Sequence, residues 1–167
     1  MCGIIGAASS RSVGKILVNG LKKMEYRGYD SAGLVLNNES EAIQLKTLGK
    51  VAKLEDLMIE KKPKAQSGIA HTRWATHGEP SQKNAHPHAS NGTIYIVHNG
   101  IIENHDELRE RLSNDGYKIE SETDSELIAH LIYSNKENGK STLEALIEAT
   151  KELHGAYSIA VIDTEQK

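Results

Sequence analysis

Cysteine is almost absent from this sequence of 167 residues, which contains a single one, Cys2. A lone cysteine excludes an intrachain disulfide framework and favours a reducing compartment. Long apolar runs are absent too: none approaches the roughly 18 residues that a membrane-spanning helix needs, and the N-terminus has no basic region followed by an apolar stretch. These absences predict a soluble, cytoplasmic protein that does not contact a membrane.

Charge of one sign does not dominate either. The formal net charge is −3 at pH 7, so the sequence predicts no general attraction for nucleic acid or for an anionic membrane. Phenylalanine is missing altogether, for which we have no physical account. The remaining composition, with 38% apolar and 26% charged residues, is typical of a globular protein, and the length suits one domain.

The single cysteine stands directly behind the initiator methionine. If Met1 is removed, Cys2 carries both a thiol and a free α-amino group, whose pKa of about 7.7–8.0 suits it to act as a base for the thiol. Such a residue is an activated nucleophile. The Gly-Ile-Ile-Gly that follows is typical of a short buried strand, which would hold the terminus in the fold. The alternative is a small buried cysteine without a chemical role, and the cysteine by itself favours that alternative.

Apolar periodicity and turn residues divide the rest of the chain into short elements. Helices are predicted over 12–24 and 51–58, and three more begin at Asn104, Thr123 and Ser141, each followed three residues later by a glutamate. Strands are predicted at 34–36 and 43–48 as a hairpin, and at 67–70, 93–97, 118–121 and 156–163. This order, without strict βαβ alternation, indicates an α+β fold with an antiparallel or mixed sheet.

Polar residues concentrate in three segments between these elements. The first, 26–33, holds an arginine and an aspartate, and is either a site or a well-bonded connection with an internal ion pair. The second, 71–80, contains the only tryptophan, Trp74. The third is Asn99-Gly100, which offers a side-chain amide donor beside a backbone N–H at the end of a strand. Asn-Gly is also the commonest hairpin turn, and the dipeptide alone favours the turn.

Five motifs in register carry a family resemblance. They are Cys2-Gly3-Ile4-Ile5-Gly6, Tyr26-Arg27-Gly28-Tyr29-Asp30-Ser31-Ala32-Gly33, His71-Thr72-Arg73-Trp74-Ala75-Thr76-His77-Gly78, His98-Asn99-Gly100 and Glu122-Thr123-Asp124. In this order they resemble the class II glutamine amidotransferases. The second and third motifs are most similar to the glutaminase domains of the glutamine–fructose-6-phosphate aminotransferase family, and the similarity runs from Cys2 to about Asp163.

The resemblance implies the N-terminal-nucleophile hydrolase fold, a four-layer αββα sandwich in which two antiparallel sheets lie between helical layers. It implies no cofactor and no metal. L-Glutamine is the implied substrate, which Cys2, freed of Met1, attacks to give a γ-glutamyl thioester and ammonia, and then glutamate. The Asn99 side chain and the Gly100 N–H are the implied oxyanion hole, as an acyl-transfer transition state needs.

The implied glutamine pocket recognises the two charges of the substrate. Arg73 pairs with its α-carboxylate, for which a planar guanidinium is suited, and Asp124 accepts its α-ammonium group. Thr76 and His77 line the same pocket. Trp74 resembles the residue that the synthases use near the ammonia exit.

The resemblance also predicts that residues 2–167 are a glutaminase domain that is incomplete at its C-terminal end. In the family this domain continues beyond the strand ending at Asp163, and the missing part should include strands of one sheet, leaving edges exposed. The family's sugar-isomerase domains, which bind fructose 6-phosphate and receive ammonia to make glucosamine 6-phosphate in the hexosamine pathway, are absent. The full-length protein is expected to be a homodimer.

Two other interpretations stay open. A non-catalytic glutamine-binding or assembly module would follow if Met1 is retained, because the α-amino group would then belong to the wrong residue. A metal site could use His71, His77, His86 and His88, although their spacing matches no common zinc pattern.

Overall fold

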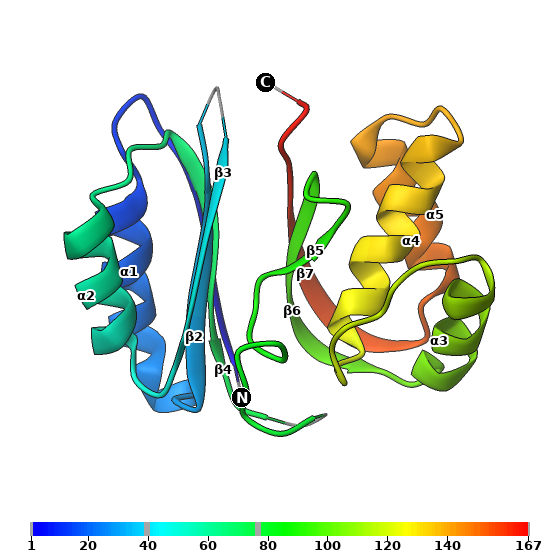
Figure 1. The fold of residues 1–167 in the computed structure, drawn as a ribbon, viewed down its shortest axis with the longest axis horizontal. Coiled ribbons are helices and arrows are strands. Elements are labelled where there is room, and N and C mark those ends of the chain that lie inside the picture. Colours follow the sequence, from blue (N-terminus) through cyan, green and yellow to red (C-terminus); the bar gives the residue numbers. More distant parts are fainter. Residues whose placement is uncertain (1, 39–40, 76–77, 167) are drawn as a thin grey trace.

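The computed structural model describes residues 2–38, 41–75 and 78–166, in which two β-sheets lie face to face between two layers of helices (Figure 1). From one side to the other the layers are a helix pair, a four-stranded sheet, a three-stranded sheet and a group of three helices. The architecture is the αββα sandwich that the family resemblance implied, and the antiparallel sheets agree with the order of elements predicted from the sequence.

The first sheet has the strand order β1-β4-β2-β3, and all neighbouring strands run antiparallel. Its strands are β1 (Gly3–Ala8), β2 (Ser31–Asn37), β3 (Ala42–Leu48) and β4 (Ser67–Arg73). Its outer face is covered by α1 (Gly14–Met24) and α2 (Val51–Lys61), and a 3₁₀ turn, Glu25–Arg27, follows α1. The predicted hairpin is confirmed by the pairing of β2 with β3 along their whole length.

Apolar side chains decide which face of each element points inward. In α1, Leu17, Val18 and Leu21 pack into the cluster beneath the sheet, while Lys22 and Lys23 remain exposed. Strand β2 is buried along almost its entire length. Both of its faces are covered, one by helices and the other by the second sheet, which explains its near-continuous run of small and apolar residues.

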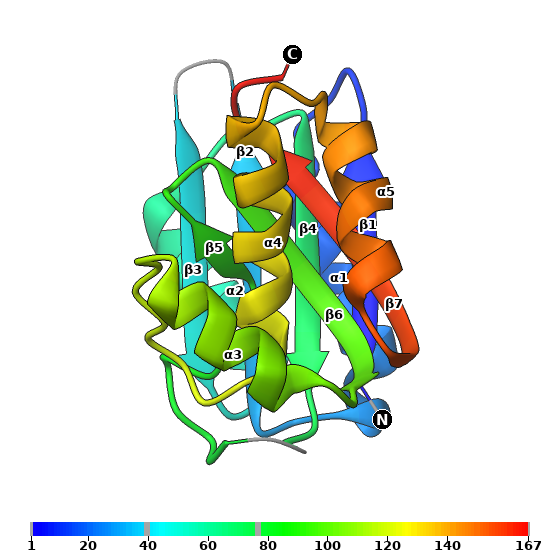
Figure 2. The same cartoon turned by 90° about the vertical axis from the view of Figure 1, so that its right-hand side faces the viewer.

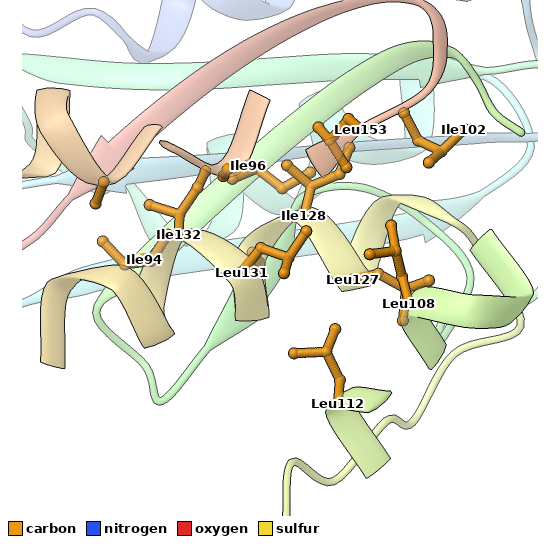
Figure 3. Packing of buried hydrophobic residues seen from close by; sticks show 13 residues of the cluster. Ile94, Ile96, Ile102, Leu108, Leu112, Leu127, Ile128, Leu131, Ile132 and Leu153 are labelled. Carbon is orange, nitrogen blue, oxygen red and sulfur yellow. The ribbon is translucent and has the colours of Figure 1, made fainter. Parts of the chain in front are cut away.

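The second sheet has the order β5-β6-β7, also antiparallel. It consists of β5 (His88–Ser90), β6 (Ile94–Ile102) and β7 (Gly155–Asp163), and α3 (His105–Asn114), α4 (Ser125–Glu137) and α5 (Thr142–Glu152) cover its outer face (Figure 2). Ile94 and Ile96 of β6 pack with Ile128 and Ile132 of α4 in the largest apolar cluster (Figure 3). None of the described helices is long and apolar enough to cross a membrane.

The Asn-Gly segment differs from the interpretation that the dipeptide alone favoured. Asn99 and Gly100 lie inside β6, which continues to Ile102 and pairs with β7 throughout. The hairpin-turn interpretation is therefore wrong. A nine-residue partner strand supplies the backbone pairing that would otherwise end at the dipeptide.

The region between α3 and α4 also differs from the prediction. Residues 118–121 form no strand. The Glu126 carboxylate accepts hydrogen bonds from the backbone N–H groups of Glu120 and Ser121, at 2.9 and 2.6 Å, in place of a neighbouring strand. At α5 the predicted capping box of Ser141 and Glu144 is confirmed.

Ile128 is fully buried between α4 and β6, and we expect Ile128→Ala to lower the free energy of unfolding by about 2–5 kcal/mol. The loss combines the apolar contact removed with the cavity left behind. Leu143→Ala on α5 is the control, because Leu143 is 67% exposed and its truncation should change stability by less than about 0.5 kcal/mol. Urea unfolding measures both, and equal losses would contradict this assignment of the core.

Candidate active site

Cys2 lies at the junction between the start of β1 and the end of β4. The pairing of Gly3 with Thr72 brings Cys2 beside Arg73 and Trp74, and the Trp74 N–H donates a hydrogen bond to the Cys2 Sγ at 3.2 Å. Burial raises the pKa of the Cys2 thiol above its ordinary value, although the Trp74 N–H acts in the opposite direction. The thiol is therefore mainly protonated near neutral pH, and it needs a base to act as a nucleophile.

Asn99 and Gly100 reach the same place from the second sheet. The Asn99 Nδ2 donates to the Cys2 carbonyl oxygen at 3.2 Å, across 97 residues of sequence. Gly100 has a φ of +137°, and a Cβ built there would clash with the carbonyl oxygen of Ala156 on β7. Only glycine fits this position, so the chain places an amide side chain beside a residue that must be glycine.

Arg73 brings a positive charge into the interior. The residue is 3% exposed, and its guanidinium donates to the carbonyl oxygens of Gly78 at 3.0 Å and Glu79 at 3.4 Å. The Asp30 carboxylate lies 3.9 Å from it and also accepts a hydrogen bond from the Ala75 N–H. The polar segment 26–33 thus supports the Arg73 side chain from a different part of the chain.

Asp124 supplies a negative charge from the N-terminal end of α4. Its Oδ2 accepts from the Ile102 N–H at 2.9 Å, and its Oδ1 accepts from the Ser125 hydroxyl at 3.2 Å. The His98 Nδ1 lies 3.8 Å from the same carboxylate and 2.8 Å from the Ser125 Oγ. These contacts connect Asp124 to the strand that carries Asn99.

The turn before Asp124 is held by charged side chains. Arg109 donates to the carbonyl oxygens of Ser121 at 3.0 Å and Thr123 at 2.8 Å, and Glu126 binds the backbone N–H groups described above. Burial alone would raise the pKa of Glu126, but the hydrogen bonds that it accepts outweigh burial and lower its pKa to about 2. The carboxylate is therefore ionised at neutral pH and fixes the approach to Asp124.

One cavity of about 680 Å³ is lined by Cys2, Arg73, Trp74, Asn99, Gly100 and Asp124. Two other predicted site residues, Thr76 and His77, lie outside the described residues. A cation, a carboxylate, a thiol and an amide donor in one cavity suit a zwitterionic substrate and acyl-transfer chemistry. Trp74 is 49% exposed and makes an edge-to-face contact with Tyr29, at 5.8 Å between ring centroids.

Several lining residues were not predicted from the sequence. Arg27 belongs to a polar segment that the sequence marked, and His98 immediately precedes Asn99, so both stand inside motifs that could have pointed to them. Tyr157 and Ser158 also line the cavity from β7. Nothing in their local pattern sets them apart from ordinary strand residues, and only the pairing of β7 with β6 brings them to the site.

Three histidines of the proposed metal set lie together beside this cavity. The rings of His71 and His86 stack with centroids 4.0 Å apart, and those of His86 and His88 meet edge to face at 4.7 Å. His77, the fourth member, lies outside the described residues. Among the residues that the structure does describe, no group of three or more histidine, cysteine or acidic side chains could hold a metal ion.

Solved structures share the fold. Glutamine phosphoribosylpyrophosphate amidotransferase from B. subtilis aligns with 98% of this chain and 35% of its own, with a TM-score of 0.84 and 23% identity. A protein described as the allosteric regulatory enzyme of purine biosynthesis aligns with 98% of this chain and 36% of its own, with a TM-score of 0.85 and 24% identity. At these identities the two structures show the fold alone: the chain belongs to the class of αββα sandwiches, here with Cys2 at the cavity.

The family described as "Glutamine amidotransferase domain" matches residues 71–167, and the chain belongs to this family. Glutamine–fructose-6-phosphate aminotransferase (isomerizing) of Haemophilus influenzae is 54% identical over 165 residues, which are 98% of this chain and 27% of the relative. The protein of the same name from Pseudomonas putida is 51% identical over 167 residues, 99% of this chain and 27% of the relative. The chain thus spans about 27% of the length of these curated relatives.

We expect Gly100→Ala to disrupt the end of β6, because its Cβ would meet the Ala156 carbonyl oxygen at a φ that only glycine adopts easily. The loss of unfolding free energy should exceed about 2 kcal/mol. Gly92→Ala is the matched control: Gly92 also has a positive φ, of +67°, but nothing lies within 4 Å of its added Cβ. Gly92→Ala should lower the free energy of unfolding by about 1 kcal/mol. Thermal unfolding measures both variants, and equal losses would contradict the described β6–β7 contact.

The Glu126 carboxylate should stabilise the fold in a pH-dependent manner. Because its folded pKa of about 2 lies below the ordinary value, its contribution is complete above about pH 5 and is lost as the pH falls toward 2. We expect Glu126→Gln to cost about 1.5–3 kcal/mol at pH 7, and the difference from wild type to shrink below pH 4.5. Urea unfolding from pH 7 to pH 3 measures it, with exposed Glu60→Gln on α2 as control. A difference that is constant with pH would disprove the role of the ionised carboxylate.

Proposed function

We propose that this domain hydrolyses L-glutamine to glutamate and ammonia through a thioester on Cys2. The observation that carries the proposal is the cavity of about 680 Å³, which is lined by the Cys2 thiol, the Asn99 amide, the Arg73 guanidinium and the Asp124 carboxylate. Membership of the glutamine amidotransferase domain family supports the same substrate. Glutamine carries a cation and an anion at one end and a cleavable amide at the other, which matches this set of groups.

In the proposed mechanism, removal of Met1 makes Cys2 the N-terminal residue. Its α-amino group takes the thiol proton, and Sγ attacks the side-chain amide carbon of glutamine. The Asn99 amide and the Gly100 N–H stabilise the oxyanion that forms. The C–N bond then breaks, the leaving nitrogen takes the proton and departs as ammonia, and water hydrolyses the thioester to glutamate. Losing one oxyanion donor should cost about 2.7–4 kcal/mol of barrier.

Substrate recognition completes the proposal. Arg73 pairs with the α-carboxylate of glutamine and Asp124 with its α-ammonium group, supported by the burial of both residues at 3% and 5% exposure. Thr76 and His77 belong to the same pocket in this proposal, and Trp74 stands at the ammonia exit, in keeping with its half-exposed position.

We further propose that the domain works within a longer protein. The relatives named glutamine–fructose-6-phosphate aminotransferase support this, since the chain matches about 27% of their length. In that protein the ammonia would pass to sugar-isomerase domains that convert fructose 6-phosphate to glucosamine 6-phosphate. The full-length protein would be a cytoplasmic homodimer.

Cys2→Ala tests the proposed reaction. Glutamate and ammonia should appear together with the wild-type domain, and the variant should lose about 10⁴-fold or more of the rate, because no other group can form the thioester. The Cys2→Ala variant should still bind glutamine, because Arg73 and Asp124 remain. The shift in melting temperature on adding glutamine measures this binding.

A diazoketone analogue of glutamine gives a second measurement on the same site. Intact mass should show loss of Met1 and then one adduct on Cys2. If Met1 is retained and the domain binds glutamine without hydrolysing it, the domain is a non-catalytic glutamine-binding module and not an enzyme. Absence of both binding and labelling would disprove the assignment of the cavity.

A further inference from the structure

His71 bridges the two sheets at the candidate active site. The residue belongs to β4 of the first sheet and is 1% exposed. Its Nε2 lies 3.0 Å from the His98 carbonyl oxygen and 2.8 Å from the Asn99 Oδ1, both on β6 of the second sheet. One ring nitrogen therefore contacts the backbone and the side chain of the strand that carries the amide donor.

The protonation of this nitrogen follows from its partners. The His98 carbonyl oxygen can only accept a hydrogen bond, so Nε2 carries the hydrogen. The Asn99 atom that faces the same N–H must then be its oxygen, which turns the amide nitrogen toward Cys2. The Nδ2 contact with the Cys2 carbonyl oxygen at 3.2 Å agrees with this orientation, since a carbonyl there also requires a donor.

The surroundings of the ring keep it in one state. Burial lowers the pKa of His71 to about 4, so the imidazole is neutral at neutral pH. Its Nδ1 is buried and has no hydrogen-bond partner among the described residues. The His86 ring stacks on it at 4.0 Å between centroids and limits its rotation. A neutral ring with hydrogen on Nε2 is the only state that suits all these contacts.

We propose that His71 is a positioning residue that holds the Asn99 amide with its NH₂ group toward Cys2 and the cavity. The inference rests on the proposed function, in which that NH₂ group stabilises the oxyanion. A flipped amide would present its oxygen to the developing negative charge, so it would lose a donor and add a repulsion. His71 itself touches no substrate atom in this proposal and acts only through Asn99.

The first test is a double-mutant cycle on glutamine hydrolysis with His71→Phe, Asn99→Ala and the double variant. We expect His71→Phe to lower kcat by about 10–100-fold with little change in KM, and Asn99→Ala to lower kcat by about 10²–10³-fold. The double variant should be no slower than Asn99→Ala alone, because the effect of His71 passes through the amide. Two losses that multiply, or a rise in KM at unchanged kcat, would overturn the proposal.

His71→Gln and His130→Phe are the matched variants. In His71→Gln the new side-chain amide retains an N–H donor near the position of the imidazole Nε2, so this variant should recover at least part of the kcat that His71→Phe loses. His130 is also a buried histidine, 6% exposed, but its Nδ1 is hydrogen-bonded to the Ser90 hydroxyl, at 2.9 Å, and not to Asn99. His130→Phe should reduce stability and leave kcat unchanged. An equal loss of kcat in His71→Phe and His130→Phe would indicate general destabilisation and overturn the proposal.

A measurement without turnover separates this proposal from the proposed function. The ¹⁵N spectrum of the imidazole of His71 should show a protonated Nε2 and an unprotonated Nδ1, assigned with the His71→Gln variant. The opposite tautomer would overturn the positioning role even if glutamine is hydrolysed. If the expected tautomer is present but Cys2→Ala does not abolish glutamine hydrolysis, the orientation of the Asn99 amide is supported and only the proposed reaction is contradicted.

Discussion

The antiparallel pairing of β1 with β4 is the constraint on which the site depends. Its register, Gly3 with Thr72, sets Cys2 beside Arg73 and lets the Trp74 N–H reach the thiol. A slip of one residue would turn every side chain of β4 to the opposite face of the sheet. The Arg73 guanidinium would then leave the cavity, and His71 would no longer face β6. The positions of Cys2, Arg73 and His71 therefore all depend on the register of β1 with β4.

The space between the sheets differs from the two outer interfaces. The helix-to-sheet interfaces hold the large apolar clusters, whereas the described apolar cluster between the sheets is small and centres on Val35, Ile69, Tyr95 and Val97. Toward the cavity the interior is polar, and the rings of the buried His71, His86 and His88 contact one another there. Stability therefore comes mainly from the outer interfaces, while the geometry of the site depends on a few directional contacts.

Sequence reasoning succeeded where a local signal matched the final environment. The amphipathic α1, the β2–β3 hairpin and the Ser141 capping box each follow from residues a few positions apart. It failed where a distant segment supplied the partner. Asn99-Gly100 has the composition of a turn but continues as a strand because β7, more than fifty residues later, pairs with it. Residues 118–121 look like a strand, but the N–H groups of Glu120 and Ser121 donate to the Glu126 side chain and not to a neighbouring strand.

The sequence by itself determined the chemical groups of this protein: a cysteine next to the initiator, an arginine, an aspartate and an amide followed by glycine, in the order of a known family. Side-chain chemistry is a property of each residue, so it can be recognised before folding. Only the tertiary structure decided that Cys2 and Asn99, 97 residues apart, meet, and that the Asn99 amide has one orientation. Those facts depend on strand register and on contacts across two sheets, because long-range pairing is chosen by the packing of the whole chain and not by local pattern.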